Sequence, residues 1–309
     1  MFQLYKQRDF NAYISDTIAF FKTCWKNFFG NYIVIMGGML ALLCVFYFFI
    51  FRDLFTALFN TVNGGVGYDI SHYFSDNPVL FVFLLLIMLV LSILFSIFSV
   101  AYPVVYLKLT EETGRADFMA SEIFERIKKF LPKIIRFALY SLVTFVPLII
   151  VAALLASVLV LLVVGVFILI LLIPAASVWF MQTFYVYLFN DVSFTDAMKQ
   201  GWRILFSRKF WHIIGSTVVI YLILSVVQSM VTMIPYLIML FSMLATGNGQ
   251  LNDEFGVYVS VLYLVSLVLS YMTSNILTVN QGLIYYSTLE QANHTRALAE
   301  IDLIGQNVE

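Results

Sequence analysis

Five long runs of apolar residues, separated by polar segments, dominate the chain; they cover 32–51, 79–107, 134–188, 211–245 and 255–288. A helix that rises about 1.5 Å per residue crosses the hydrocarbon core of a bilayer in about 20 residues. Four runs therefore fit one span each, and 134–188, which holds no charged residue after Arg136, fits two spans. We place the turn of that run within 156–165 and expect Pro147 and Pro174 to kink its two helices. The pattern predicts an all-α polytopic membrane bundle with six transmembrane helices.

The composition agrees with this pattern. Hydrophobic residues make up 62% of the chain, charged residues only 11%, and the mean hydropathy is +0.94. A soluble domain is nearer half apolar and about a quarter charged. The two cysteines, Cys24 and Cys44, show no pairing pattern, and the polar N-terminus shows no cleavable signal peptide. We therefore interpret the chain as an integral membrane protein.

The distribution of basic residues tests the number of spans. Of the 17 Lys and Arg residues, only Arg52 falls on the opposite side of the membrane from the others in a six-span arrangement. Basic residues gather in cytoplasmic loops, so this asymmetry favours an even number of spans with both termini in the cytoplasm. We expect the protein in the bacterial inner (cytoplasmic) membrane.

Three polar segments that precede spans have a common pattern; they cover 15–28, 121–134 and 195–208. Each opens with a hydroxyl residue and an acid (Ser15-Asp16, Ser121-Glu122, Thr195-Asp196), which indicates a helix start. Apolar residues then recur at helical spacing, with Lys and Arg between them. This pattern is typical of amphipathic helices that lie at the cytoplasmic interface. For 193–208 a catalytic loop or a nucleic-acid arm is the alternative.

The even-numbered spans also end alike, with Tyr106, Tyr187 and Tyr286 in register. Each tyrosine alone is an ordinary interfacial anchor, but the repetition is informative. We predict a threefold internal repeat of a surface helix followed by two spans. The repeat units cover about 15–110, 119–190 and 193–290 of a single membrane domain, 1–309, and 291–309 forms a cytoplasmic tail.

Candidate chemistry is sparse in the sequence. No ionisable residue maps to the middle of a predicted span, and the three histidines fall on different loops. A Ser-His-Asp set could be drawn from Ser71, His72 and Asp76, but neighbours in a glycine-rich loop produce such a set by chance. No nucleotide-binding, nucleophile-elbow or zinc-protease motif is present. We therefore predict no enzymatic activity, no catalytic or metal-binding residue and no cofactor.

Two sets of residues are candidates for binding. The basic belt would serve topology and anionic lipid, or dock an anionic partner; it comprises Arg126, Lys128, Lys129, Lys133, Arg136, Lys199, Arg203, Arg208 and Lys209. The second set is a polar groove in spans five and six, which would admit a lipid headgroup or a peptide segment; its members are Gln228, Asn275, Asn280 and Gln281. The alternative for these amides is hydrogen bonding between neighbouring helices, which holds a bundle together.

The stretch DAMKQGWRILFSRKFW (196–211), together with the six spans and the amphipathic segments, resembles a broad group of uncharacterised bacterial six-helix inner-membrane proteins. That group is similar to the membrane domain attached to some glycerophosphodiester phosphodiesterases. The resemblance implies the fold; it implies no phosphodiesterase activity, because no soluble domain accompanies the spans here.

Two functions fit the sequence. The first is a non-enzymatic scaffold or accessory subunit of a membrane protein complex, acting in membrane-protein insertion or biogenesis. Its partners would be membrane lipids and other integral membrane proteins, with the translocon or the ribosome as candidates, and no DNA. The alternative is an uncoupled carrier or binder of lipids or other apolar small molecules.

Overall fold

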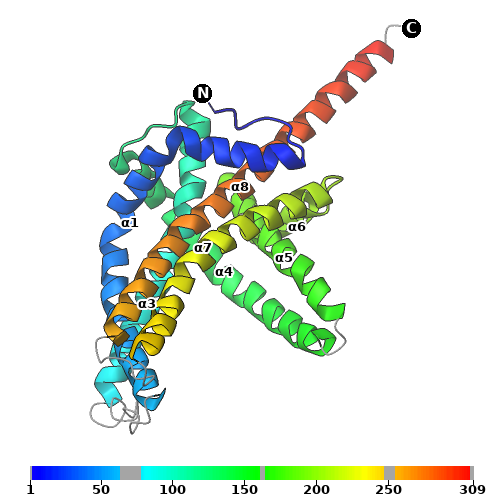
Figure 1. Ribbon diagram of the computed structural model, residues 1–309. Helices are drawn as coiled ribbons and strands as arrows, with labels where there is room; N and C mark the ends of the chain where they lie inside the picture. Colours follow the sequence, from blue (N-terminus) through cyan, green and yellow to red (C-terminus); the bar gives the residue numbers. More distant parts are fainter. Residues whose placement is uncertain (1, 63–77, 161–163, 247–254, 307–309) are drawn as a thin grey trace. The chain divides into compact units, whose positions relative to one another are not determined.

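The computed structural model describes residues 2–62, 78–160, 164–246 and 255–306, and within these ranges all regular structure is helical. The helices are labelled in Figure 1: α1 (Phe10–Val62), α3 (Pro78–Thr113), α4 (Ala120–Val160), α5 (Val164–Phe189), α6 (Phe194–Leu205), α7 (Phe210–Thr246) and α8 (Phe255–Gln306). All of them except α6 are long and apolar enough to cross a membrane, which gives six candidate spans in the described chain. The six-span prediction is confirmed at this level.

The long apolar run 134–188 divides where we expected. Helix α4 ends at Val160 and α5 begins at Val164, inside the predicted range; residues 161–163 lie outside the described part of the chain. Pro147 lies within α4 and Pro174 within α5, and both helices continue through them. Proline is tolerated here because neighbouring groups in a helical bundle can satisfy the backbone carbonyls that it frees.

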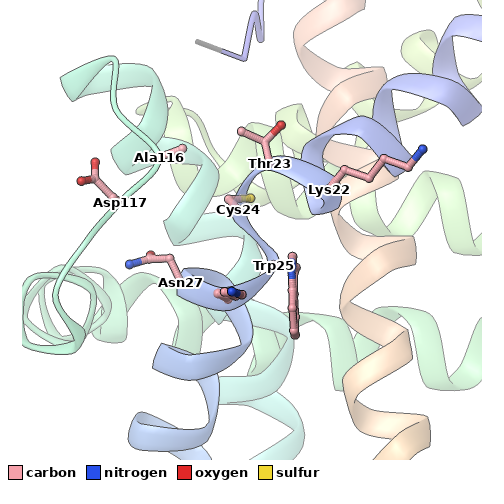
Figure 2. Close-up of a pocket in the computed structure, with 8 residues that line it drawn as sticks. Lys22, Thr23, Cys24, Trp25, Asn27, Ala116 and Asp117 are labelled. Atoms are coloured by element: carbon pink, nitrogen blue, oxygen red, sulfur yellow. The ribbon is translucent and has the colours of Figure 1, made fainter.

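Two of the predicted surface segments are continuous with the spans that follow them. Segment 15–28 is part of α1, and segment 121–134 is part of α4. The ribbon of α1 changes direction near Cys24 and Trp25 without a break in the helix (Figure 2). Segment 195–208 differs, because α6 ends at Leu205 and a short turn separates it from α7.

The predicted helix starts were wrong by one to five residues. Helix α1 begins at Phe10, where the Asp9 carboxylate accepts a hydrogen bond from the Ala12 amide at 2.8 Å, so Ser15 lies inside the helix. Helix α4 begins at Ala120, before Ser121.

At α6 the cap is Ser193 rather than Thr195, and its hydroxyl accepts from the Asp196 amide at 3.2 Å. At α4 the carboxylate of Glu122 accepts from the Met119 amide at 2.8 Å. The acids of the first turn were therefore identified correctly, but their partners lie three residues upstream, which is the spacing that a capping pair requires.

The chain divides into two compact units. Unit 1 comprises residues 1–31, 100–221 and 275–309, and unit 2 comprises residues 32–99 and 222–274. Unit 1 therefore holds the three predicted surface segments, α5, and the ends of α3 and α8. The single-domain description and the repeat boundaries stay predictions.

The core of unit 1 forms where α3, α5 and α8 end. Residues 101–107 of α3 are all buried, as are 181–188 of α5 and 279–287 of α8. Gly282 allows this convergence, because a Cβ atom there would lie 2.3 Å from Leu107 Cδ1 and 2.6 Å from the Tyr185 hydroxyl. Gly201 of α6 lies equally close to α5, where a Cβ atom would come within 2.9 Å of the Thr183 backbone nitrogen.

Unit 2 contains residues 32–62 of α1, 78–99 of α3, 222–246 of α7 and 255–274 of α8. Hydrogen bonds between neutral groups join its helices, such as Tyr32 with Ser99 at 2.8 Å and Gln228 Nε2 donating to the Ser266 carbonyl at 2.8 Å. Most apolar side chains of α3 between residues 82 and 94 are exposed, as expected for a surface that faces lipid.

Candidate functional site

Most of the charged contacts of unit 1 lie in the region that includes the predicted basic belt, which we call the basic end of unit 1. This region includes a short N-terminal strap, residues 3–9. Arg8 fixes this strap, and its side chain is fully buried (0% exposed). Its guanidinium pairs with Asp16 at 2.9 Å and donates to the carbonyls of Leu4 and Gln3 at 2.7 Å each. Its amide donates to Ser287 Oγ of α8 at 3.0 Å. A buried guanidinium is tolerated only when its donors are satisfied in this way.

Burial also governs the ionisation of this region. It lowers the pKa of Arg8, and the ion pair with Asp16 opposes that shift. Lys209, at the start of α7, donates to the Arg8 carbonyl at 2.8 Å; burial lowers the pKa of Lys209, and the nearby Asp9 opposes the shift. The N-terminal strap is therefore tied to α1, α7 and α8.

Glu111, near the end of α3, joins three elements of unit 1. Its two carboxylate oxygens accept from the Tyr5 hydroxyl at 2.6 Å, the Tyr286 hydroxyl at 2.9 Å and Lys108 Nζ at 2.8 Å. Burial and the hydrogen bond to this carboxylate raise the pKa of Tyr5 above its ordinary value. Sequence analysis missed Glu111; the signal that could have found it is an acid one turn beyond the tyrosine at a span end.

Asn280 and Gln281, two members of the predicted polar groove, are completely buried in unit 1. The Gln281 amide donates to Thr217 Oγ1 at 3.0 Å, and its backbone carbonyl accepts from Gln182 Nε2 at 2.9 Å. Asn280 Nδ2 donates to Thr17 Oγ1 at 3.1 Å. These amides join α8 to α1, α5 and α7, which is the packing role that was the alternative to a groove.

The other two members are placed separately. Gln228 belongs to unit 2 and is partly buried against Ser266, whereas Asn275 is buried and belongs to unit 1. An open groove that includes all four amides stays a prediction.

The nine residues of the predicted basic belt all lie in unit 1, and they fall into groups that differ in their bonding partners. Four of them form ion pairs: Arg126 with Glu112, Lys128 with Glu125, Lys133 with Asp191, and Lys199 with Asp196. The Lys133 ammonium lowers the pKa of the Asp191 carboxyl. Four others are exposed and have no ion pair within the described residues: Lys129, Arg136, Arg203 and Arg208. Lys209, bonded to the Arg8 carbonyl, is the ninth.

The tyrosines that we aligned at the span ends are buried rather than positioned as interfacial anchors. Tyr106 donates to Asn27 Oδ1 at 3.0 Å and to the Ala116 carbonyl, and Tyr286 donates to Glu111. Tyr187 packs its ring against Phe137. The hydroxyl groups of Tyr106 and Tyr286 find protein partners because these span ends are covered by other parts of unit 1.

A pocket of about 480 Å³ lies between α1 and the segment that joins α3 to α4 (Figure 2). Its lining consists of Lys22, Thr23, Cys24, Trp25, Lys26, Asn27, Ala116 and Asp117. Asn27 forms the joint between the two walls, since its amide donates to the Phe118 carbonyl at 2.9 Å and its carbonyl accepts from the Phe118 amide at 3.2 Å. Sequence analysis placed Lys22 and Lys26 in a surface segment but did not identify the pocket.

Other chemistry is limited to what the described residues show. Within them, no group of three or more His, Cys, Asp or Glu side chains is close enough to hold a metal ion. Residues 63–77, and with them Ser71, His72 and Asp76, lie outside the described part of the chain.

Comparison with family models, curated proteins and solved structures finds no match to this chain. The resemblance to bacterial six-helix membrane proteins therefore stays a prediction.

Proposed function

We propose that this chain is a non-enzymatic membrane scaffold or accessory subunit that binds the transmembrane helices of other integral membrane proteins during their insertion or assembly. The observation that carries the proposal is the outer half of α4. From Val146 to Leu155 every residue except Ala152 is exposed, so apolar side chains surround the helix. One turn earlier Ser141 and Phe145 are buried, so the same helix is packed at its base.

The sequence of this exposed segment favours a protein partner over lipid alone. Small residues recur four apart, at Ala152 and Ala156 and at Ala153 and Ser157. Small residues at this spacing let helix backbones approach closely in a bilayer, where van der Waals packing replaces the hydrophobic effect as the driving force. A helix with both features is suited to contact another transmembrane helix.

The basic end of unit 1 supports a second contact outside the membrane. Lys129 and Arg136 lie on α4, and Arg203 and Arg208 lie on or just after α6. Exposed cations without an acidic partner attract anionic surfaces, either lipid headgroups or a cytoplasmic partner. A ribosome or a translocon would meet this surface.

The threefold repeat and the interfacial position of the surface segments are part of the same proposal. In unit 1 each surface segment contacts the end of the preceding even-numbered span. The start of α1 bonds α8 through Thr17 and Asn280, and the start of α4 pairs with α3 through Arg126 and Glu112. Helix α6 accepts a hydrogen bond from the Trp179 indole of α5 at the Met198 carbonyl, at 3.0 Å. This cyclic order of contacts supports the threefold repeat.

Site-specific photo-crosslinking tests the scaffold. A photoreactive residue at Val143 or Val151 of α4 is expected to give discrete protein adducts in native membranes, whereas the same residue at Leu86 or Val90 of α3, equally exposed in unit 2, gives lipid adducts only. Ala152→Leu/Ala156→Leu should reduce the α4 adducts by blocking close approach. Lipid adducts alone at all four positions would contradict the proposal.

The alternative, an uncoupled carrier or binder of lipids, is favoured by one observation, the pocket at Lys22 and Lys26. A purified protein that keeps a defined lipid and shows no protein adducts from α4 would support it. The two functions are distinguished because one depends on α4 and the other on α1.

A further inference from the structure

We propose that the pocket between α1 and the 114–119 segment binds the phosphate of an anionic phospholipid headgroup, with Lys22 and Lys26 as its cationic ligands. This inference does not depend on the scaffold proposal, since none of the pocket residues lies on the outer half of α4. It rests on the charge of one wall, the rigidity of the joint, and the position of an exposed tryptophan.

Lys22 and Lys26 lie four residues apart in an exposed part of α1, and both line the pocket. Neither forms an ion pair within the described residues, and Lys26 Nζ lies 5.8 Å from the centre of the Trp25 ring. Like charges at this spacing repel each other. A phosphate between them removes the repulsion and adds charge-assisted hydrogen bonds.

The opposite wall is held in place rather than free to move. Phe118, one residue after Asp117 of the lining, is bonded to Asn27 through both its amide and its carbonyl. Asn31 Nδ2 also donates to the Phe118 carbonyl, at 2.8 Å. Because the wall is fixed before a ligand arrives, little conformational entropy is lost on binding.

Trp25 points to a ligand at the membrane interface rather than in free solution. Its side chain is 53% exposed although the rest of its turn contacts the core through Cys24 and Phe28. Figure 2 shows the indole extending from α1 on the other side from Asn27 and Asp117. Tryptophan is enriched at the headgroup level of bilayers, and α1 continues from this point into a membrane span. Lipid acyl chains would therefore lie beside the indole while the phosphate reaches the lysines.

The pocket also limits which headgroup fits. A volume of about 480 Å³ is in the range of small-molecule sites. The lining offers two cations, with one carboxylate, Asp117, on the 116–117 wall, while the Thr23 hydroxyl already donates to the Ala19 carbonyl at 2.9 Å. A headgroup with one phosphate and neutral hydroxyl groups, such as phosphoglycerol, suits this set better than an inositol polyphosphate, which carries more negative charge than two lysines balance.

Native mass spectrometry of the full-length protein in detergent, with added phosphatidylglycerol or phosphatidylcholine, tests the site. We expect wild-type protein to retain phosphatidylglycerol, and Lys22→Gln/Lys26→Gln to bind it about 30-fold more weakly, from about tenfold for each 1.4 kcal/mol and about 1 kcal/mol for each basic residue. Lys22→Arg/Lys26→Arg should bind it as wild type does.

The matched control is Lys199→Gln/Arg203→Gln, which removes two charges four residues apart on α6, away from the pocket. Equal losses from both pairs would overturn the site, because they would indicate diffuse attraction. Retention of phosphatidylglycerol by the Lys22→Gln/Lys26→Gln protein would also overturn it, provided that its circular dichroism matches wild type. Lysine-dependent binding of inorganic phosphate with no preference between the two lipids would overturn the assignment to a lipid.

Discussion

In unit 1 polar side chains bond to one another across several helices and include charged groups, whereas the hydrogen bonds described between helices of unit 2 join neutral groups. In unit 1 Gln281 bonds to Gln182 and Thr217, and Glu111 bonds to Tyr5 and Tyr286; in unit 2 Tyr32 bonds to Ser99, and Gln228 bonds to the Ser266 carbonyl. A polar network contributes stability only when all its members are present, but a single pair can be lost at small cost. We therefore expect the loss of a polar contact to cost more stability in unit 1 than in unit 2.

The close approach of α6 to α5 should give the largest difference between the units. Gly201→Ala would place a Cβ atom 2.9 Å from the Thr183 backbone nitrogen, which cannot move aside as a side-chain end could. We expect a loss of about 1–3 kcal/mol in unfolding free energy, the usual cost of overpacking. Gly38→Ala in unit 2, where no atom lies within 4 Å, should be neutral or slightly stabilising.

Thermal unfolding in detergent, followed by a fluorescent thiol probe or by loss of soluble monomer, measures both variants. If the two glycine variants unfolded at the same temperature, the packing of α6 on α5 would not be the constraint that we describe.

The buried amides should give the next largest difference. Gln281→Leu removes the hydrogen bonds of the Gln281 side chain to Thr217 Oγ1 and Gln182 Nε2 in a fully buried site, so we expect it to cost about 1–2 kcal/mol of unfolding free energy. Gln228→Leu removes one hydrogen bond to Ser266 and a buried side-chain oxygen that has no partner among the described residues, so its cost should stay near or below about 0.6 kcal/mol.

Guanidinium or SDS titration of the two purified variants, each against wild type, measures this difference. A Gln228→Leu protein less stable than Gln281→Leu would reverse the comparison and would place the stronger polar network in unit 2.

The sequence predicted those features that depend on local pattern. Hydrophobic runs of about membrane thickness identified six spans, and the acids Glu122 and Asp196 identified the first turns of α4 and α6. The ends of the spans could not be interpreted in the same way, because the sequence does not show whether lipid or protein surrounds a tyrosine near a span end. Tyr106 and Tyr286 were read as anchors, and only tertiary contacts with Asn27 and Glu111 show them to be core residues.

The candidate sites show the same limit. Lys22 and Lys26 of α1 precede Asp117 of the 114–119 segment by about ninety residues. The periodicity of the sequence carries no information about which distant segments lie side by side. Asn280 and Gln281 were selected correctly as unusual polar residues within a span, but their burial depends on which helices surround α8. Sequence therefore identified the residue types and not their partners.

The smallest expected difference concerns pH, at the start of α6. The hydrogen bond from Ser193, and then Lys199, lower the pKa of Asp196 below its ordinary value of 3.8. The lower folded pKa means that this carboxylate contributes stability that is fully present above the ordinary value and is lost as the pH falls through the folded value. Within unit 2, the Tyr32–Ser99 and Tyr47–Ser92 contacts join neutral groups, so they have no such dependence.

Hydrogen exchange followed by mass spectrometry, from about pH 7 to pH 3 and corrected for intrinsic rates, separates the two regions. Amides in the first turn of α6 should lose protection at the acid end, while a peptide that contains Ser92 and Ser99 keeps its protection. Asp196→Asn should show at pH 7 the faster exchange that wild type shows in acid, because it lacks the charge that stabilises the positive end of the helix dipole. If the protection of α6 stayed unchanged across this pH range, packing on α5 alone would stabilise the first turn of the helix. The hydrogen bonds of the cap would then result from that packing and would not stabilise the helix start themselves.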